Sequence, residues 1–352
     1  MKAIRHYGFG GPIQIDDVEP PSPTAREVVV RVKRCQIGGD VLKVLAGTGP
    51  VRDAENYVFP HTGGYRGAGV VEAVGSDVGG LAVGDRVVIN GFVNCNTCEM
   101  CRRGLDNLCP NSRMIGIDSG APGALAELTA APEWAVFKLP DSVSFARATL
   151  LPNMALLVHA YERALPRPGF TTAVIGCGLV GSCAIAVARA YGASRVVGVD
   201  TQVAALEMAT RCGATDLVDA NARDAGNAIL DLTDGVGVDV AVELVGVDTT
   251  IQQAIASTTR RGITLLIGAL GAVSLSFPHY YRDIIQSEVD LRTCFGKTQA
   301  DFAVAVKLAG AGLLDLSAQS LKEHPFHAFE TALEEARSPD NSDIHIISME
   351  SV

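Results

Sequence analysis

Residues 173–181 read Ala-Val-Ile-Gly-Cys-Gly-Leu-Val-Gly, and this stretch decides the fold of the C-terminal half of the chain. Its first three residues are apolar and typical of a buried strand, and a helical pattern runs over residues 179–191. The G-x-G-x-x-G spacing is typical of the turn that joins the first strand and helix of a dinucleotide-binding unit. The sequence therefore predicts a strand, a glycine loop and a helix that together bind a pyrophosphate.

Each residue of the glycine loop has a separate expected role. Gly176 permits the tight turn, Gly178 lets the backbone approach the pyrophosphate, and Gly181 lets helix and strand pack closely. Leu179 and Val180 lie in the first turn of the helix, where backbone N–H groups have no partner within the helix and hold phosphate oxygens. We therefore expect these residues to form the cofactor site.

An acidic residue stands at the distance that this kind of site requires. The apolar run over residues 195–199 predicts a second strand, and Asp200 follows it about 20 residues after the loop. A carboxylate in this position accepts hydrogen bonds from the ribose hydroxyls and repels a 2′-phosphate, so it favours NAD over NADP. The strand, the loop, the helix and the acid together predict an NAD(H) site.

The two halves of the chain differ in their patterns. Up to about residue 150, glycine, proline and short β-branched runs predict strands at 28–32, 69–74 and 85–89 and a compact all-β unit. Beyond it, apolar strands alternate with helices, which is typical of a parallel sheet covered on both faces. These predicted elements are 172–175, 179–191, 195–199, 203–212, 238–242 and 263–267, followed by a helix at 301–308 and a mixed tail.

The composition excludes several classes of protein. The 352 residues are long enough for two domains, and 48% hydrophobic against 19% charged residues exclude global disorder. A net charge of -10 argues against a nucleic-acid partner, because phosphates would be repelled. The mean hydropathy of +0.24 is positive, but no apolar run reaches the roughly 18 residues of a membrane span. We expect a cytoplasmic protein with a small-molecule substrate, and neither nucleic acid nor membrane as partner.

Four of the nine cysteines lie close together, in the pattern Cys-x2-Cys-x2-Cys-x7-Cys. The four are Cys95, Cys98, Cys101 and Cys109. In a long chain without a secretory signal, such spacing indicates metal rather than disulfides, and four thiolates close a tetrahedron around Zn²⁺. A closed site leaves no position for water or substrate. The sequence therefore predicts one structural zinc ion per chain.

With these motifs in order, the chain resembles the zinc-containing alcohol dehydrogenase branch of the medium-chain dehydrogenase/reductase family over nearly all its length. The family-like segments include Gly-Val-Val-Glu-Ala-Val-Gly at 69–75, Val-Gly-Asp-Arg-Val at 83–87 and Val-Glu-Leu-Val-Gly at 242–246. The resemblance implies an α/β architecture with a GroES-like catalytic domain at residues 1–152, whose structural zinc lobe spans about 92–112. It implies a Rossmann NAD-binding domain at 153–295 and a return to the catalytic domain at 296–352.

The same resemblance carries two further implications. Val245 and Gly268 would contact the cofactor beside the glycine loop and Asp200. The chain would form a homodimer or homotetramer through an edge of the Rossmann sheet, near residues 265–271 and 291–294.

The chain departs from the family at the catalytic zinc. The family binds this ion through a Cys, a His-Glu pair and a later Cys or carboxylate. Here Ile37 or Gly38 takes the first position, depending on the register, and Tyr65 and Arg66 replace the His-Glu pair. Asn153 follows Leu-Leu-Pro, where the third ligand is expected. A catalytic zinc needs about three protein donors, so we expect this one to be missing. The remaining alternative is an unforeseen metal arrangement of Cys35, His61 and Asp40.

Without zinc, other groups must stabilise the charge that develops during hydride transfer. Tyr65 and Arg66 both donate hydrogen bonds, and Tyr65 would deliver a proton if the guanidinium lowered its pKa. Asn153 is a third polar candidate, and Asp40 a supporting acid. Each of these residues could instead be a structural residue of the site.

Three functions follow from these residues. The first is a NAD(H)-dependent oxidoreductase that lacks catalytic zinc and reduces a polarised C=C, C=N or C=O bond of a small molecule. The second is a conventional alcohol or polyol dehydrogenase whose zinc has unusual ligands. The third is a protein that binds NAD without catalysis.

Overall fold

The computed structural model describes residues 1–48, 54–268, 273–277, 279–338, 341 and 343–351. The chain divides into two compact units. The first consists of Met1–Pro152, Thr298–Gly310 and Ser320–Val352, and the second of Asn153–Lys297 and Ala311–Gln319. Residues 311–319, which the sequence-based division assigned to the catalytic domain, therefore group with the second unit.

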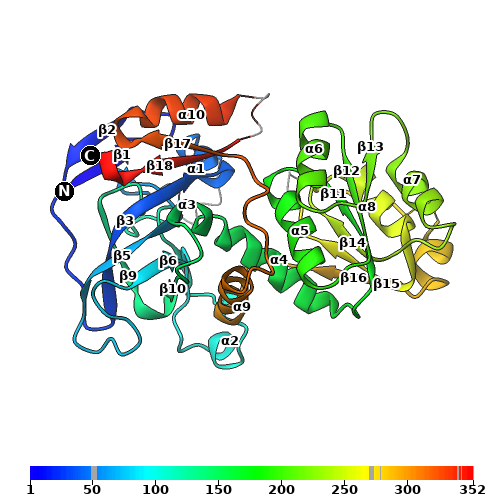
Figure 1. The fold of residues 1–352 in the computed structure, drawn as a ribbon, viewed down its shortest axis with the longest axis horizontal. Coiled ribbons are helices and arrows are strands. Elements are labelled where there is room, and N and C mark those ends of the chain that lie inside the picture. The colour runs from blue at the N-terminus through cyan, green and yellow to red at the C-terminus, as the bar shows by residue number, and fades with distance from the viewer. Residues whose placement is uncertain (49–53, 269–272, 278, 339–340, 342, 352) are drawn as a thin grey trace. The chain divides into compact units, whose positions relative to one another are not determined.

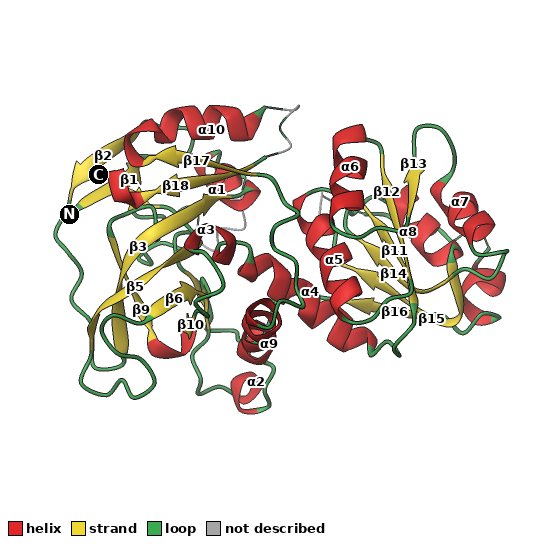
Figure 2. Cartoon of the chain, in the orientation of Figure 1, coloured by secondary structure: helices red, strands yellow, loops and turns green. Residues whose placement is uncertain are grey.

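Strands predominate in the first unit (Figure 2). Its elements in chain order are β1 (Lys2–His6), β2 (Ile13–Asp17), β3 (Glu27–Ile37), α1 (Gly39–Leu45), β4 (His61–Thr62), β5 (Arg66–Val74), β6 (Arg86–Ile89), β7 (Phe92–Val93), α2 (Glu99–Arg102), β8 (Arg113–Met114), β9 (Leu128–Pro132), β10 (Val136–Lys138), α3 (Phe145–Ala148), α9 (Gln299–Gly310), β17 (Leu321–Pro325), α10 (Phe329–Arg337) and β18 (Ile344–Ser348). The helices α1, α2 and α3 correct the expectation of an all-β unit up to about residue 150.

The main sheet of the first unit is built around β3. Its strand order is β10-β6-β5-β3-β18-β17, and β9 also pairs with β3. The β-branched run of β3 is buried on the faces of this sheet, as residues of high β-propensity usually are. A Cβ at Gly69 of β5 would collide with the carbonyl oxygen of Arg31, so only glycine lets β5 lie this close to β3.

The C-terminal tail completes this sheet. β18 pairs antiparallel with β3 and parallel with β17, which makes β17 an edge strand, and α10 packs on β18. The sequence predicted only a mixed tail here, because these short strands are paired through contacts far apart in the chain.

The second unit is an open parallel sheet with helices packed against it (Figure 1). Its elements are α4 (Leu151–Ala164), whose first two residues belong to the first unit, β11 (Thr171–Ile175), α5 (Leu179–Ala190), β12 (Arg195–Asp200), α6 (Val203–Arg211), β13 (Asp216–Asp219), α7 (Ala225–Leu232), β14 (Val238–Glu243), α8 (Asp248–Ala256), β15 (Thr258–Leu266) and β16 (Asp290–Thr293). The strand order β13-β12-β11-β14-β15-β16 is that of a dinucleotide-binding sheet, as the glycine loop predicts.

The position of the glycine loop follows from this order. β11 lies between β12 and β14, with parallel neighbours on both sides, so the loop after β11 lies where the strand order reverses. Ligands of open α/β sheets bind outside the carboxyl ends of the strands at this point. Asp200 ends β12 and Val245 follows β14, so both come from the strands next to the loop.

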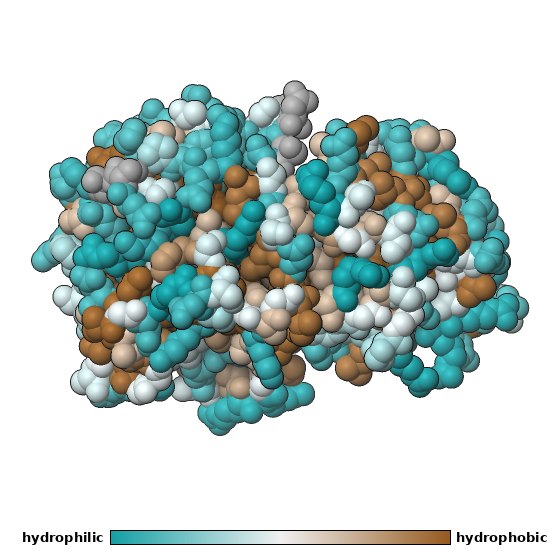
Figure 3. Space-filling model, in the orientation of Figure 1, coloured by the Kyte–Doolittle hydropathy of each residue, from teal (hydrophilic) through white to brown (hydrophobic). Residues whose placement is uncertain are grey.

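Two further sequence-based expectations concern surfaces. No helix in the described ranges is both long and apolar enough to cross a membrane, and Figure 3 shows hydrophobic residues as patches among hydrophilic ones on the face in view. The expected subunit contacts include the edge strand β16, whose Leu291 is exposed, and the segment 265–271, of which residues 269–271 lie outside the described residues.

Candidate cofactor, zinc and catalytic sites

The glycine loop has the geometry that each of its glycines was expected to provide. Gly176 adopts a φ of 94°, which is the left-handed region that glycine enters without strain. A Cβ on Gly181 would collide with the carbonyl oxygen of Gly176, whereas a Cβ on Gly178 would meet no atom within 4 Å. The space over Gly178 is therefore open, and α5 begins directly after it with the amides of Leu179 and Val180.

Asp200 joins the end of β12 to this loop. Its Oδ2 accepts a hydrogen bond from the Cys177 amide at 2.7 Å, and its Oδ1 accepts from the amides of Thr201 at 2.7 Å and Gln202 at 2.9 Å. A carboxylate offers about four acceptor positions, so one remains for a ribose hydroxyl. The Asp200 carboxylate thus orients the loop and still has one position that can accept a hydrogen bond from a ligand.

Glu243, a residue without an assigned role in the sequence analysis, organises the segment after β14. Its buried Oε1 accepts hydrogen bonds from the amides of Val245 at 2.9 Å and Gly246 at 2.8 Å, and its backbone carbonyl accepts from Gly268 at 3.0 Å. The Val245 side chain lies against Gly176, because a Cβ there would be 2.9 Å from Val245 Cγ2. The two later cofactor candidates therefore lie beside the loop, held by Glu243.

The two glycines give a matched pair of expected results. Gly181→Ala should destabilise the second unit by about 3 kcal/mol, since its methyl group overlaps the Gly176 carbonyl. Gly178→Ala should cost less than about 1 kcal/mol in folding but weaken NADH binding about tenfold, because its methyl group enters the open space. Thermal unfolding and fluorescence titration with NADH measure both quantities. If Gly178→Ala bound NADH as tightly as the unsubstituted chain, the prediction that the cofactor approaches the backbone at Gly178 would be wrong.

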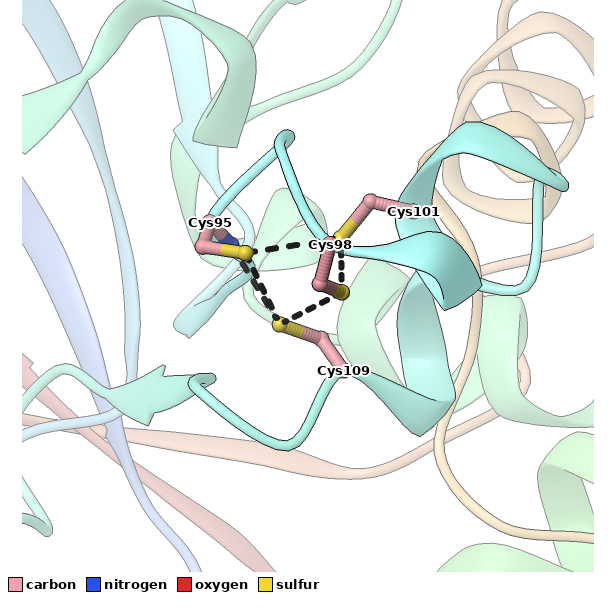
Figure 4. A group of neighbouring side chains, drawn as sticks. All are labelled: Cys95, Cys98, Cys101 and Cys109. Carbon is pink, nitrogen blue, oxygen red and sulfur yellow. Dashed lines mark hydrogen bonds between the residues drawn. The ribbon is translucent and has the colours of Figure 1, made fainter.

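The four cysteines of the predicted zinc lobe converge on one point (Figure 4). The Sγ–Sγ separations are 4.0 Å for Cys95–Cys101, 3.4 Å for Cys98–Cys101, 3.8 Å for Cys98–Cys109 and 3.5 Å for Cys95–Cys109. Zinc–sulfur bonds of about 2.3 Å in a tetrahedron place the sulfurs about 3.8 Å apart. The four thiols therefore fit a closed zinc site.

Neighbouring groups favour the thiolate form of Cys95 and hold the lobe in place. Hydrogen bonds from the hydroxyl and backbone of Thr97 lower the pKa of the Cys95 thiol to about 5. The Asn94 amide donates to Cys101 Sγ at 3.6 Å and its Oδ1 accepts from Gln299 at 2.6 Å, so the lobe is tied to the start of α9. Such contacts to ligand sulfurs are usual in metal sites.

The catalytic candidates of the first unit lie together at the start of β5 and α1. Arg66 Nη1 donates to Asp40 Oδ1 at 2.6 Å, and its guanidinium carbon lies 5.3 Å from the centre of the Tyr65 ring. The side chains of Arg66 and Asp40 remain 12% and 18% exposed, so the ion pair is not sealed from ligands. Burial alone would lower the pKa of Arg66, but the attraction and hydrogen bond of Asp40 outweigh it and raise that pKa.

Tyr65 is more deeply buried than its neighbour. Its ring packs with Val44 and Ile117 and lies against the backbone of Gly91, where a Cβ would be 2.5 Å from the ring. Burial raises the pKa of Tyr65 well above its usual value, against the smaller lowering effect of Arg66. Arg66 does lower this pKa, as proton delivery by Tyr65 would require, but desolvation of the phenolate outweighs that effect. Tyr65 stays a neutral hydroxyl at physiological pH.

Neither Ile37 nor Gly38, the two residues that the sequence analysis aligned with the family's first zinc-ligand position, has a metal-binding side chain. Ile37 and Cys35 belong to the apolar core under β3, where burial raises the pKa of the Cys35 thiol to about 12. A Cβ on Gly38 would collide with Arg66 Nη1 and lie 2.6 Å from Asp40 Oδ1. The Arg66–Asp40 ion pair thus fills the space that a side chain at position 38 would need.

Only two groups of at least three His, Cys, Asp or Glu side chains have ligand atoms within 4.8 Å of one another in the described part of the chain. They are the cysteine lobe and a second group formed by His324, Glu335 and His345. Neither includes Cys35, His61 or Asp40. The second group escaped the sequence analysis because its members are far apart in the tail, and burial lowers the pKa of both histidines.

His61 lies instead in an aromatic cluster with His6, their ring centres 5.4 Å apart. Among the described residues, neither nitrogen of His6 nor Nε2 of His61 has a hydrogen-bond partner. Burial, and to a lesser extent His6, lowers the pKa of His61 to about 4. His61 is therefore a neutral core residue.

This pKa has a consequence for stability. Below pH 6.5, His61 binds a proton in the unfolded chain but stays neutral in the folded chain until about pH 4. The free energy of unfolding therefore falls as the pH falls through this window. The loss should reach about 2 kcal/mol between pH 6.5 and 5. Urea unfolding at both pH values should show this loss shrinking in His61→Leu but persisting in His327→Gln, which changes an exposed histidine. An unchanged loss in His61→Leu would contradict the assignment.

Asn153, the remaining catalytic candidate, is buried in the first turn of α4. It belongs to the second unit, whereas Asp40, Tyr65 and Arg66 belong to the first. The structure therefore brings three of the four candidates together within one unit.

Comparison with known proteins agrees with both units. Residues 24–141 match the family model of the alcohol dehydrogenase GroES-like domain, and residues 180–311 match that of zinc-binding dehydrogenases. The chain is 30% identical to a sorbitol dehydrogenase of Bacillus subtilis (strain 168), covering 92% of this chain and 90% of the relative. It is 32% identical to D-xylulose reductase A of Aspergillus niger, covering 78% and 77%.

A solved structure shows the same architecture. A NAD-dependent alcohol dehydrogenase superposes with a TM-score of 0.86 at 25% identity, covering 99% of this chain and 100% of that one. The predicted fold class, a GroES-like domain with a Rossmann domain, is confirmed. The chain therefore belongs to the zinc-binding alcohol dehydrogenase branch of the medium-chain dehydrogenase/reductase family, whose enzymes are NAD(P)-dependent oxidoreductases.

Proposed function

We propose that this chain transfers hydride between NAD(H) and a small organic molecule without a catalytic zinc, and that its reaction is the reduction of a polarised C=C, C=N or C=O bond. The ion pair between Arg66 and Asp40 carries this proposal. It fills the space of a side chain at Gly38, and it places a guanidinium where the family has the glutamate beside its zinc-binding histidine. A fixed positive charge opposes a cation at the same place.

The residues of the second unit fit NAD(H). The open space over Gly178, the amides that begin α5 and the remaining acceptor position of Asp200 match a pyrophosphate and a ribose diol. A carboxylate at Asp200 repels a 2′-phosphate, so the unphosphorylated cofactor is favoured. Cys95, Cys98, Cys101 and Cys109 would hold one structural zinc ion.

The chemistry divides between the cofactor and two side chains. NADH supplies the hydride when bound. A polarised acceptor gathers negative charge on its heteroatom as hydride arrives, and donors aimed at that charge lower the barrier. Tyr65 offers a neutral O–H and Arg66 a permanent cation, so both suit this role. The proton that completes the reduction comes from Tyr65 or from water, and Asp40 holds the guanidinium in place.

The names of the relatives favour a second candidate. Sorbitol dehydrogenase and D-xylulose reductase act on polyols or their ketoses, so a zinc-dependent polyol dehydrogenase with unusual ligands is the alternative. In either case we expect a small-molecule substrate and a homodimer or homotetramer that uses the edge strand β16.

Metal counting and a substrate screen separate the two candidates. Because His324, Glu335 and His345 form a second group of metal donors, zinc is counted in a His345→Gln chain purified without added zinc or chelator. We expect about one zinc per chain, held by the cysteine lobe. We also expect NADH to be consumed with enones, enoyl thioesters or cyclic imines, at a rate that a brief chelator treatment leaves unchanged.

Two zinc ions per chain in that variant, with oxidation of polyols by NAD abolished by the chelator, would overturn the proposal and establish the alternative. A third result is activity that needs no second zinc but occurs with simple polyols alone. It would support hydride transfer without a catalytic zinc and contradict the proposed reduction of a polarised bond.

A further inference from the structure

The group formed by His324, Glu335 and His345 lies in the first unit, where three elements of the C-terminal tail meet. The register of the parallel strands pairs Lys322 with His345 and His324 with Ile347, so these four residues share one face of the β17–β18 pair. α10 packs on these strands (Figure 1), and it contributes Glu335. Residues far apart in sequence are thus brought to one point.

The three donor atoms form a compact triangle. His324 Nε2 lies 2.9 Å from His345 Nδ1, and Glu335 Oε2 lies 3.6 Å from each of these nitrogens. Zinc bonds to nitrogen and oxygen of about 2.0–2.2 Å place tetrahedral ligands about 3.4 Å apart. Each side of the triangle is therefore within about 0.5 Å of the separation that a bound zinc ion requires.

The orientation of His345 is set from outside the triangle. Its Nε2 lies 2.9 Å from Asn341 Oδ1, which can only accept a hydrogen bond, so Nε2 carries the proton. The lone pair of Nδ1 then points toward His324 and Glu335. A histidine whose far nitrogen donates to an oxygen is the usual arrangement of a metal ligand.

The Glu335 carboxylate makes this largely buried group suited to a cation, because a buried cation needs a charged or coordinating partner. The side chains of His324 and His345 are only 6% and 2% exposed, and that of Glu335 is 35% exposed although its Oε2 atom is itself buried. Lys322 Nζ lies 2.8 Å from Glu335 Oε2, and its side chain is 48% exposed. The Lys322 ammonium is therefore already attracted to this carboxylate, and the flexible lysine side chain can turn outward when another cation binds.

We propose that His324 Nε2, His345 Nδ1 and Glu335 Oε2 bind a divalent transition-metal ion, Zn²⁺ in the first place, with water as the fourth ligand and with the Lys322 ammonium as its competitor. Two imidazoles and one carboxylate select zinc and its neighbours over Mg²⁺ and Ca²⁺, which prefer oxygen ligands. The ion would tie the edge strand β17 and α10 to β18. This site is independent of the cysteine lobe and of the reaction proposed above.

The test measures zinc uptake by the full chain. Protein whose cysteine lobe is loaded, and from which loosely bound metal has been removed, is titrated with Zn²⁺ by calorimetry. We expect one further equivalent, with nitrogen and oxygen ligands only in X-ray absorption. His345→Gln should lose it, with an affinity lower by more than about 100-fold, since loss of a ligand exceeds the loss of an outer partner. His327→Gln, which changes an exposed histidine on the same tail, should keep it.

Two variants separate a metal site from a purely hydrogen-bonded cluster. Lys322→Gln removes the competing ammonium and should raise zinc affinity by up to about fivefold, while Asn341→Ala should lower it about tenfold through the orientation of His345. The Asn341 variant also serves if His345→Gln fails to fold. The proposal would be overturned if the unsubstituted chain, His345→Gln and Asn341→Ala took up zinc equally. It would also be overturned if the unsubstituted chain took up no zinc beyond that of the cysteine lobe. In either case the cluster would be a hydrogen-bonded support of the fold.

Discussion

Replacing Tyr65 with phenylalanine is expected to lower kcat by about 100-fold or more, because a donor to developing charge is worth about that factor. The ring would keep its packing against Gly91, Val44 and Ile117, so folding should change by no more than about 1.5 kcal/mol. NADH affinity should be unchanged, because the glycine loop belongs to the second unit. Steady-state kinetics, thermal unfolding and NADH titration measure the three quantities.

Arg66→Lys supplies the matched control for charge. It keeps a cation beside Asp40 but loses the planar guanidinium, whose fork of donors fits carboxylates and oxyanions. We expect kcat to fall about tenfold, less than in Tyr65→Phe. A kcat unchanged in both variants would show that neither side chain contacts the reacting group.

The pH dependence gives a further check on Tyr65. Hydrogen-bond donation needs the protonated hydroxyl, and burial raises the pKa of Tyr65 above its usual value of 10.0. The decline of kcat that results from its ionisation should therefore begin above pH 10 and be missing in Tyr65→Phe. A Tyr65-dependent decline near neutral pH would contradict the burial of this hydroxyl.

Replacing Cys98 with serine is the second change with a large expected effect. The lobe is rich in polar residues and has few apolar contacts of its own, so zinc binding supplies much of the energy that folds it. We expect the zinc of the cysteine lobe to be lost and the first unit to be destabilised by about 4 kcal/mol or more. Metal analysis, urea unfolding and proteolysis of the lobe measure the effect.

Cys294→Ser is the matched control, because Cys294 is partly buried like Cys98 but lies outside the lobe. Its zinc content and unfolding should stay close to those of the unsubstituted chain. NADH binding should survive in both variants, since the glycine loop proposed to hold the cofactor lies in the other unit. Full zinc content in Cys98→Ser would exclude the closed four-cysteine site.

Much of the fold could be predicted from local patterns. The strand at 172–175 and the helix at 179–191 correspond to β11 and α5 within a residue, because apolar periodicity and glycine punctuation act over short distances. The tail after residue 310 could not be predicted. Its strand β18 pairs with β17 on one side and, on the other, with β3 near the start of the chain.

The sites divide in the same way. The cysteine spacing and the glycine loop carry their geometry within short segments, so the sequence was sufficient to predict four converging thiols and an open approach over Gly178. The sequence also predicted that Tyr65 and Arg66 replace the ligand pair of the family. It did not show whether Arg66 or burial would dominate the pKa of Tyr65, because desolvation depends on residues from other elements that pack around the ring.

The sequence by itself thus determined the class of the fold, the cofactor loop and the cysteine lobe, since each depends on residues a few positions apart. The tertiary structure decided three other features: that Arg66 and Asp40 close the space over Gly38, that Glu243 anchors the segment after β14, and that His324, Glu335 and His345 meet. Their common physical reason is that burial and pairing join residues from separate elements, and no local pattern records which elements will lie in contact.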